Sequence, residues 1–259
     1  MVDSQTRKSG SWVAGIAVAA AIAVVVAVYL WVHRGPPEAP PAESVAQAPT
    51  APPDVRLPTP EETDARIRRE AGNLSPRAEL AEWLKQSSLL ERWVAVTDNL
   101  AEGVSPRKQL PFLAPPQPFK VQQKAKRTYI DSRSYARYDT FAEVVSSIDA
   151  KAFAALVREL HPLLQAAYHA LGYPDRSIDV AAAQALQRLV AAPVVEGPVE
   201  VKAAGQGALY EFADPKLEKQ GVVAKHLLRM GPRNTKLIQA KARELVQALE
   251  LPATAARTP

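Results

Sequence analysis

The chain has 259 residues, a formal net charge of +5 and no cysteine. The missing thiols exclude disulfides, thiolate nucleophiles, Fe–S clusters, Cys-ligated zinc and a lipid anchor on cysteine. The length allows one or two domains. The first sixty residues differ so strongly in composition from the rest that they predict separate segments.

Residues 12–32, "WVAGIAVAAAIAVVVAVYLWV", carry no charge. At 1.5 Å rise per residue such a helix crosses a hydrocarbon core of about 30 Å. Aromatic rings near both ends suit the membrane interface: Trp12, Tyr29 and Trp31. A cleaved signal peptide is the alternative, but its apolar region is shorter and is followed by small residues. The pattern predicts a single-pass transmembrane helix after a stub of residues 1–11.

Orientation depends on a few charges. Arg7, Lys8 and the amino terminus precede the helix, and Arg34 follows it. Because cytoplasmic flanks are enriched in Lys and Arg, the bias places the stub in the cytoplasm. We therefore predict a bacterial inner-membrane protein whose C-terminal domain is periplasmic, with the inverted topology left open.

Residues 33–60 form the next segment, in which nine prolines follow residue 34 and large apolar side chains are nearly absent. Such a stretch cannot build a core and favours an extended, polyproline-like linker with a reach on the order of 80 Å. Recognition of the prolines by an SH3-type domain is the alternative. The segment predicts a spacer that holds a domain away from the bilayer.

Residues 61–250 predict a mainly helical domain, with residues 251–259 as a disordered tail. Thr59, Pro60 and Glu62 form a capping-box pattern at its start. Helices are expected at about 60–71, 76–87 and 89–102. Residues 103–133 are proline-rich and then basic, and predict an irregular segment.

Helix returns with apolar side chains spaced by three or four: Tyr135, Tyr138, Phe141, Val145 and Ile148. Asp149 is the expected cap of a longer helix, which Gly172 ends. Pro162 lies inside that helix, so a kink or break is expected near His161.

The C-terminal third predicts a helix at "IDVAAAQALQRLVAA", a hairpin at "GPVEVKAAGQGALYEFA" and a short helix from Pro215. In "LLRMGPRN" we expect Gly231 to close one helix, Pro232 to start the next and Asn234 to cap it. A helix-turn-helix has a similar corner, but a periplasmic domain would meet no chromosome. The expected fold class is mainly α: a single-pass transmembrane helix plus a compact helical domain with one small β-hairpin.

Positive charge gathers in two stretches. Residues 105–137 hold eight Lys and Arg against one acid, and residues 220–243 hold six against none. Ordinary solvated faces and a mobile loop are one interpretation. If the stretches share a face, they predict a cationic surface whose suitable partners are anionic lipid headgroups, wall polymers, an acidic protein or nucleic acid. The candidate binding residues are Lys120, Lys124, Lys126, Arg127, Tyr129, Arg133, Arg137, Arg229, Arg233 and Lys236.

Catalytic signals are weak. No zinc-protease motif, nucleophile elbow or phosphate loop occurs in the sequence, so we expect no cofactor and no metal. Nucleic acid is not expected as a partner, because the predicted topology places the domain across the membrane from the chromosome. His161 beside Glu159 is a candidate acid–base pair. Asp98 and Glu102 share a helix face and are candidates for glycosidic cleavage. For both pairs, solvated or salt-bridged side chains are the simpler interpretation.

Several motifs together resemble a proteobacterial family known as domain of unknown function 3014: "VTDNLAEG", "YARYD", "LHPLLQAAYHALG", "EGPVEV", "YEFADPKLE" and "LLRMGPRN". The resemblance covers roughly residues 60–246 and implies a membrane-anchored protein with a proline-rich spacer and no assigned activity. We expect a non-catalytic envelope scaffold or adaptor that binds a periplasmic partner through the basic face. The alternatives are a protein that binds or hydrolyses the cell wall, and a homo-oligomer that associates through Gly15 and Ala19.

Overall fold

The first helix that the structure describes begins at Pro60, directly after its predicted cap Thr59. The computed structural model describes residues 59–205 and 210–252, all within one compact unit, Arg56–Pro259. The stub, the transmembrane helix, nearly all of the linker and most of the predicted tail lie outside these residues. Within the described part, every helix is too short or too polar to span a bilayer.

Three helices open the domain: α2 (Pro60–Ala71), α3 (Ala78–Trp83) and α4 (Leu89–Ala101). The predicted capping box is present, since the Thr59 hydroxyl accepts from the Glu62 amide and the Glu62 carboxylate accepts from the Thr59 amide. Helix α3 is shorter than predicted. Short 3₁₀ turns, η1 (Pro106–Lys108) and η2 (Pro111–Leu113), follow α4.

The predicted helical face from Tyr135 to Ile148 is divided between α5 (Ser132–Ala136) and α6 (Asp139–Ser147). Helix α7 (Ala150–Ala170) is capped by Asp149 as expected. Of the kink or break expected near His161, the break does not occur, because α7 continues through Pro162. Pro162 and Arg158 lie on the exposed side, where water can satisfy the Arg158 carbonyl that a proline cannot reach.

Helix α8 (Ile178–Ala191) leads to strands β3 (Glu200–Ala203) and β4 (Tyr210–Phe212), then to α9 (Pro215–Glu218) and α10 (Val222–Ala248). The predicted corner is confirmed, because Gly231 has φ 81° and ψ 166° and divides α10 into two helical halves. Asn234 does not cap the second half. Its buried side chain instead donates to the Tyr135 and Met230 carbonyls and to Asp139.

The prediction of a single hairpin is incomplete. Strands β1 (Val121–Lys124) and β2 (Arg127–Ile130) lie in the stretch expected to be irregular, and the sheet is antiparallel in the order β1-β2-β3-β4. Thr128 is paired with Val201 and Tyr129 with Glu200, which joins the two hairpins across some seventy residues of sequence. Polar residues hide the period-two pattern of β1, and its turn lacks the usual Gly or Asn.

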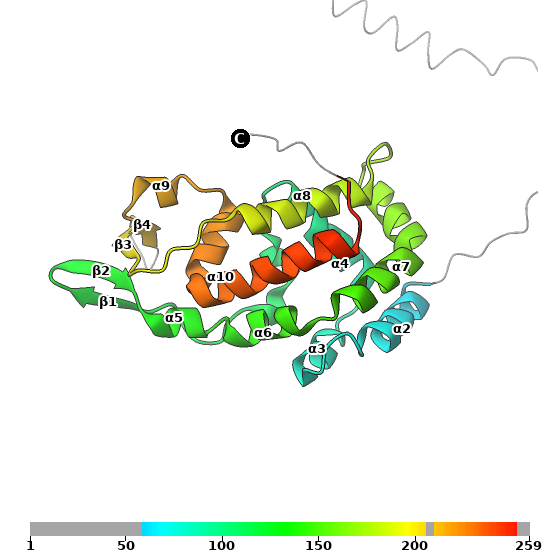
Figure 1. Cartoon of the computed structure of the whole chain (residues 1–259), viewed down its shortest axis with the longest axis horizontal. Coiled ribbons are helices and arrows are strands. Elements are labelled where there is room, and N and C mark those ends of the chain that lie inside the picture. The colour runs from blue at the N-terminus through cyan, green and yellow to red at the C-terminus, as the bar shows by residue number, and fades with distance from the viewer. Residues whose placement is uncertain (1–58, 206–209, 253–259) are drawn as a thin grey trace, which may run out of the picture. The chain divides into compact units, whose positions relative to one another are not determined.

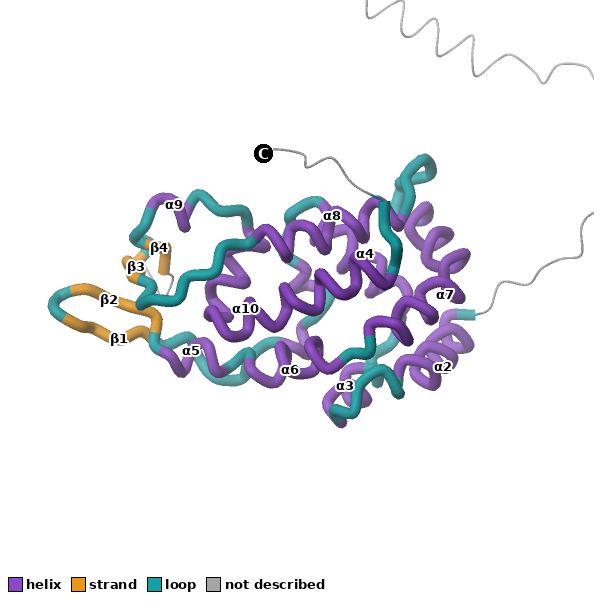
Figure 2. The backbone as a smooth tube through the Cα atoms, viewed as in Figure 1, coloured by secondary structure: helices purple, strands orange, loops and turns teal. Residues whose placement is uncertain are grey.

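The strands and α9 lie at one end of the domain, and α2, α3 and α7 lie at the other (Figure 1). Figure 2 shows that strand structure is confined to that end, while α10 runs between the sheet and the helices. Helix α8 packs against both α4 and α10.

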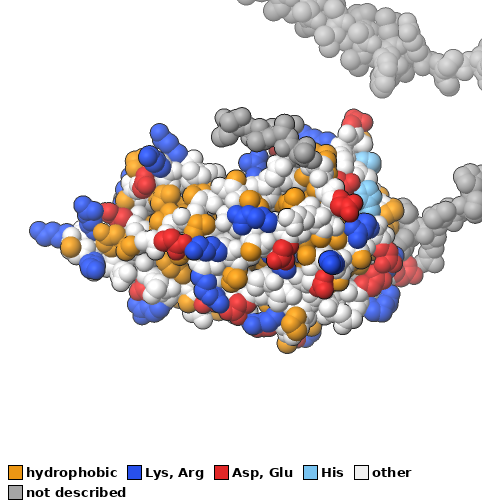
Figure 3. Space-filling model, viewed as in Figure 1, with side chains coloured by type: hydrophobic (Ala, Val, Ile, Leu, Met, Phe, Trp, Pro, Cys, Tyr) orange, Lys and Arg blue, Asp and Glu red, His pale blue; other side chains and the backbone are white. Residues whose placement is uncertain are grey.

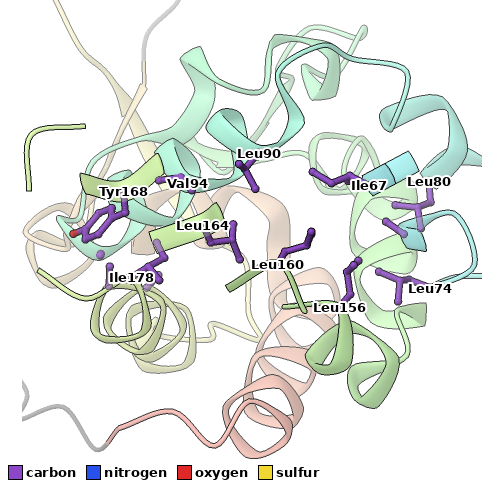
Figure 4. Close-up of a cluster of buried hydrophobic side chains, with 14 of the residues drawn as sticks. Ile67, Leu74, Leu80, Leu90, Val94, Leu156, Leu160, Leu164, Tyr168 and Ile178 are labelled. Carbon is purple, nitrogen blue, oxygen red and sulfur yellow. The ribbon is translucent and has the colours of Figure 1, made fainter. Parts of the chain in front are cut away.

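Apolar side chains of α4, α7 and α8 form the largest core, including Val94, Leu160, Leu164 and Ile178 (Figure 4). A second cluster lies under the sheet, around Ile130, Val201 and Phe212, together with Leu228 from α10. A third joins α6 to α10 through Ala142, Leu227 and Ile238. Because Leu227 and Leu228 enter different clusters, α10 links the sheet end to the helical end.

Candidate binding surface

The β1–β2 hairpin brings three of the candidate cations to one apex. Lys124 is paired with Arg127, so the loop between the strands is only Ala125-Lys126. Both loop residues have positive φ, 50° and 66°, as in a type I′ turn. Gly and Asn are the usual residues at these positions. Most other side chains crowd the backbone when φ is positive. The chain therefore places a lysine where local energetics favour glycine.

The apex is open to solvent and incompletely neutralised. Lys124, Lys126 and Arg127 are exposed. Arg127 Nη1 lies 3.4 Å from Glu200 Oε2, whereas neither lysine forms an ion pair with any residue that the structure describes. Figure 3 shows basic side chains at the tip of this hairpin.

The strand register defines a buried and an outward face of the sheet, because directly opposed residues of antiparallel strands share a face. Ile130, Val201 and Phe212 point into the core. The opposite face carries Gln122, Lys124, Arg127, Tyr129, Glu200, Lys202 and Glu211. We call this set, together with Lys126 at the turn, the outer sheet face.

Tyr129 lies at the middle of the outer sheet face. It is half-buried, opposite Glu200 and Gln122, and it alternates with inward-pointing Thr128 and Ile130. An aromatic ring beside Lys124 and Arg127 can offer a stacking surface to a planar group or a sugar.

Charge is distributed unevenly along the domain. The sheet end, residues 116–138 and 198–230, contains eleven Lys and Arg and five Asp and Glu. The remaining described residues contain sixteen Lys and Arg and eighteen Asp and Glu. The domain is therefore polarised, with a cationic sheet end and a weakly acidic helical end.

Two further candidates in the first basic stretch have internal partners. Arg133 pairs with Asp131 at 2.6 Å, and its hydrogen bonds lower the pKa of the Asp131 carboxyl to about 2. Arg137 donates to the Ser134 and Gln117 carbonyls and lies over the rings of Phe119 and Tyr138. Lys120 is exposed and precedes β1. Arg137 therefore stabilises the base of the hairpin.

The second basic stretch does not add free cations to this surface. Arg229 lies 4.8 Å from the Phe212 ring centroid and donates to the Tyr210 carbonyl; burial lowers the pKa of its guanidinium. Arg233 pairs with Asp139 and Glu143 on α6, and Lys236 pairs with Glu196. The corner at Gly231 separates Arg229 from Arg233, since the first contacts the sheet and the second contacts α6.

The carboxylates considered for catalysis have structural partners. Glu102 pairs with Arg176 at 2.9 Å. The Tyr168 hydroxyl lies 3.5 Å from Asp98, whose pKa is raised by burial and by the charge of Glu102. These contacts tie the end of α4 to the last turn of α7 and to the end of the α7–α8 loop.

Histidine pairings were missed at the sequence level because their partners are distant along the chain. His161 Nε2 lies 2.9 Å from Asp179 Oδ2, while Glu159 pairs with Arg66. His226 Nε2 lies 2.8 Å from Ser105 Oγ. Within residues 59–205 and 210–252, no three His, Asp or Glu side chains gather in a way that could hold a metal ion.

Comparison with known protein families identifies one for most of the described domain. Residues 89–246, from the start of α4 to near the end of α10, match the family described as a protein of unknown function (DUF3014). No curated protein and no solved structure matches the chain.

Proposed function

Because the chain belongs to the DUF3014 family, for which that description names no function, we propose one from its surface chemistry. The protein is a membrane-anchored envelope adaptor that binds an acidic partner through the outer sheet face and the apex of the β1–β2 hairpin. The observation that carries the proposal is the turn at Ala125-Lys126, with positive φ at two non-glycine residues.

Such a turn is informative because strained backbone persists where another requirement outweighs local stability. Glycine at position 126 would relieve the strain. Lysine extends the cationic reach of the hairpin beyond Lys124 and Arg127. The sequence therefore keeps charge at the apex at a cost to the fold.

The charge distribution supports the same function. A cationic end on a weakly acidic body orients the domain toward an anionic partner and speeds their encounter. The predicted proline-rich linker would provide reach from the membrane. Both features suit a tethered binding module, and neither requires a reaction.

The partner is expected to present clustered carboxylates or phosphates. Lys124 and Lys126 have no ion-pair partners among the described residues. An acidic partner can therefore bind these two lysines without separating either of them from an acid of the domain. Contacts of this kind are worth little singly and are screened by salt. Affinity would come from the group of cations acting together.

The test is in-cell photo-crosslinking from Gln122, on the outer sheet face, in the full chain. We expect specific captured species that disappear when Lys124, Lys126 and Arg127 are all replaced by glutamate. The matched control replaces Arg69, Lys151 and Arg243 by glutamate, which changes the net charge equally but at exposed positions of the helical part. Capture that survives the apex variant, or that the control abolishes equally, would contradict the proposal.

A cell-wall binding module is the second candidate, and Tyr129 is the observation that favours it. By strand register Tyr129 shares the outer sheet face with Lys124, Arg127 and Glu200, a combination suited to stacking a sugar and binding its polar groups. Sedimentation with purified peptidoglycan separates the two functions. Tyr129→Ala would abolish co-sedimentation if the wall is the partner, and would leave capture of an acidic protein largely intact.

A further inference from the structure

An apolar cavity of about 200 Å³ lies between α4, α7, α8 and the end of α10. Trp93 and Phe153 face it from α4 and α7, with ring centroids 5.3 Å apart. Val94, Leu164 and Ile178, labelled in Figure 4, also belong to its wall. The space is partly open to solvent, and its lining is almost entirely apolar.

The space exists because α8 presents small side chains to it. Ala182 and Ala185 line the cavity together with Leu186 and Leu189, at the spacing of one helix face. Leucine at either alanine position would fill part of the volume. The alanines of α8 are therefore the reason that the cavity is present.

One side of the wall is polar. His161 Nε2 lies 2.9 Å from Asp179 Oδ2, and the two side chains are 40% and 39% exposed. Both residues line the cavity, so the pair stands between solvent and the apolar interior. The His161–Asp179 pair can donate a hydrogen bond to the polar end of a bound molecule and accept one from it.

The end of α10 covers another side. Glu250 has φ 52°, a left-handed closing conformation common after a helix, and the half-buried Leu251 that follows lines the cavity with Leu249. Helix ends open more easily than helix centres. This end of α10 is the natural entry route.

We propose that the cavity binds a small amphiphile, with an apolar body about as large as an eight-carbon chain and an uncharged hydrogen-bonding end such as a hydroxyl. The size follows from the volume, since an engineered apolar cavity of about 150 Å³ holds benzene. The uncharged end follows from Asp179, which would repel a carboxylate or phosphate. This inference is independent of the binding function proposed for the hairpin.

The experiment uses the full chain in lipid nanodiscs and a photoreactive 1-octanol that carries a diazirine on its chain. Labelled residues are located by mass spectrometry. We expect labels on cavity-lining residues of α4 and α8, removed by excess 1-octanol but not by 1,8-octanediol, whose second hydroxyl would be buried without a partner.

Substitutions distinguish the cavity from unspecific labelling. Ala182→Phe fills the space and is expected to lower α4 and α8 labelling at least ten-fold, whereas Ala166→Phe, the same change at an exposed position of α7, leaves it unchanged. Circular dichroism checks folding, and Ala182→Leu, with a partial loss, replaces the Phe variant if that variant unfolds. His161→Leu should weaken competition by 1-octanol but not by n-octane. Absence of labels on α4 and α8, or labelling that persists in folded Ala182→Phe, would overturn the proposal.

Discussion

At the scale of single residues, Gly231 shows how one position can determine a fold. Its φ of 81° and ψ of 166° lie in a region essentially restricted to glycine. A Cβ atom at this position would lie 2.5 Å from Cγ of Tyr135. Gly231 therefore supplies both the corner of α10 and the close approach of α10 to α5.

We expect Gly231→Ala to destabilise the domain for both reasons. Gly172→Ala is the matched control, because Gly172 also has positive φ, 104°, but no atom lies near its Cβ position. The control should lose about 1–2 kcal/mol from backbone strain. Gly231→Ala should lose about 1–3 kcal/mol more from overpacking. Urea unfolding of residues 56–259 measures both, and equal losses would show that the contact with Tyr135 is unimportant.

His226 gives the domain a pH-dependent stability. Burial, followed by the charges of Arg107 and Arg229, lowers the pKa of its imidazole. The unfolded chain therefore binds a proton more readily than the folded chain. The stability that this residue contributes is complete above the unfolded pKa of about 6.5 and is lost as pH falls toward the lower folded pKa.

The measurement is the free energy of unfolding at pH 7.5 and pH 5.5. We expect the wild-type protein to lose stability on acidification and His226→Gln, which cannot titrate but can still bond Ser105, to lose less. An identical loss in both proteins would assign the pH effect to other groups.

At the scale of elements, the β1–β2 hairpin carries a positive charge at its turn and is less stable because of it. In the type I′ turn a lysine at position 126 is held at φ 66°, a conformation that glycine adopts without strain. The β2–β3 pairing keeps the hairpin in the sheet despite this strain. If Lys126 serves binding rather than stability, its replacement by glycine should raise stability and weaken binding together. A purely structural hairpin would show only the first effect.

Lys126→Gly should raise the free energy of unfolding by about 0.5–1 kcal/mol and at the same time weaken capture of the acidic partner. Lys219→Gly is the control, since Lys219 is exposed with φ −73°, where glycine is slightly destabilising. Thermal unfolding and crosslinking yield are measured on the same samples. A variant that gains stability and keeps full capture would remove Lys126 from the binding surface.

At the scale of the whole molecule, the separation of charge predicts how binding responds to salt. Because the cationic end holds eleven bases against five acids, attraction of an acidic partner should decline steadily as ionic strength rises. Crosslinking yield from Gln122, measured in membranes at about 50 and 300 mM salt, should fall several-fold at the higher concentration. A yield that does not change would indicate an apolar interface.

The topology on which the proposed function depends is testable by a fusion. Alkaline phosphatase, which is active only in an oxidising compartment, should be active when joined after Pro60, because the charge bias places this residue across the inner membrane. A fusion of the enzyme to the amino terminus should be inactive. The reverse result would place the domain in the cytoplasm and reopen nucleic acid as a partner.

The sequence by itself determined the local features of this fold. The capping box at Thr59, the cap at Asp149 and the glycine corner at Gly231 are confirmed, because each depends on contacts within a few residues. The helical periodicity and the β3–β4 hairpin were also readable for this reason. The family resemblance follows from the same motifs.

The tertiary structure alone decided which residues meet across the chain. Strands β1 and β2 become part of a sheet through β3, and Pro162 is tolerated because its side of α7 faces solvent. Arg229 and Arg233, four residues apart, contact different elements. Basic side chains that look alike in the sequence can lie free on a surface or form an internal ion pair. Their burial and pairing depend on packing among distant segments, which no local pattern encodes.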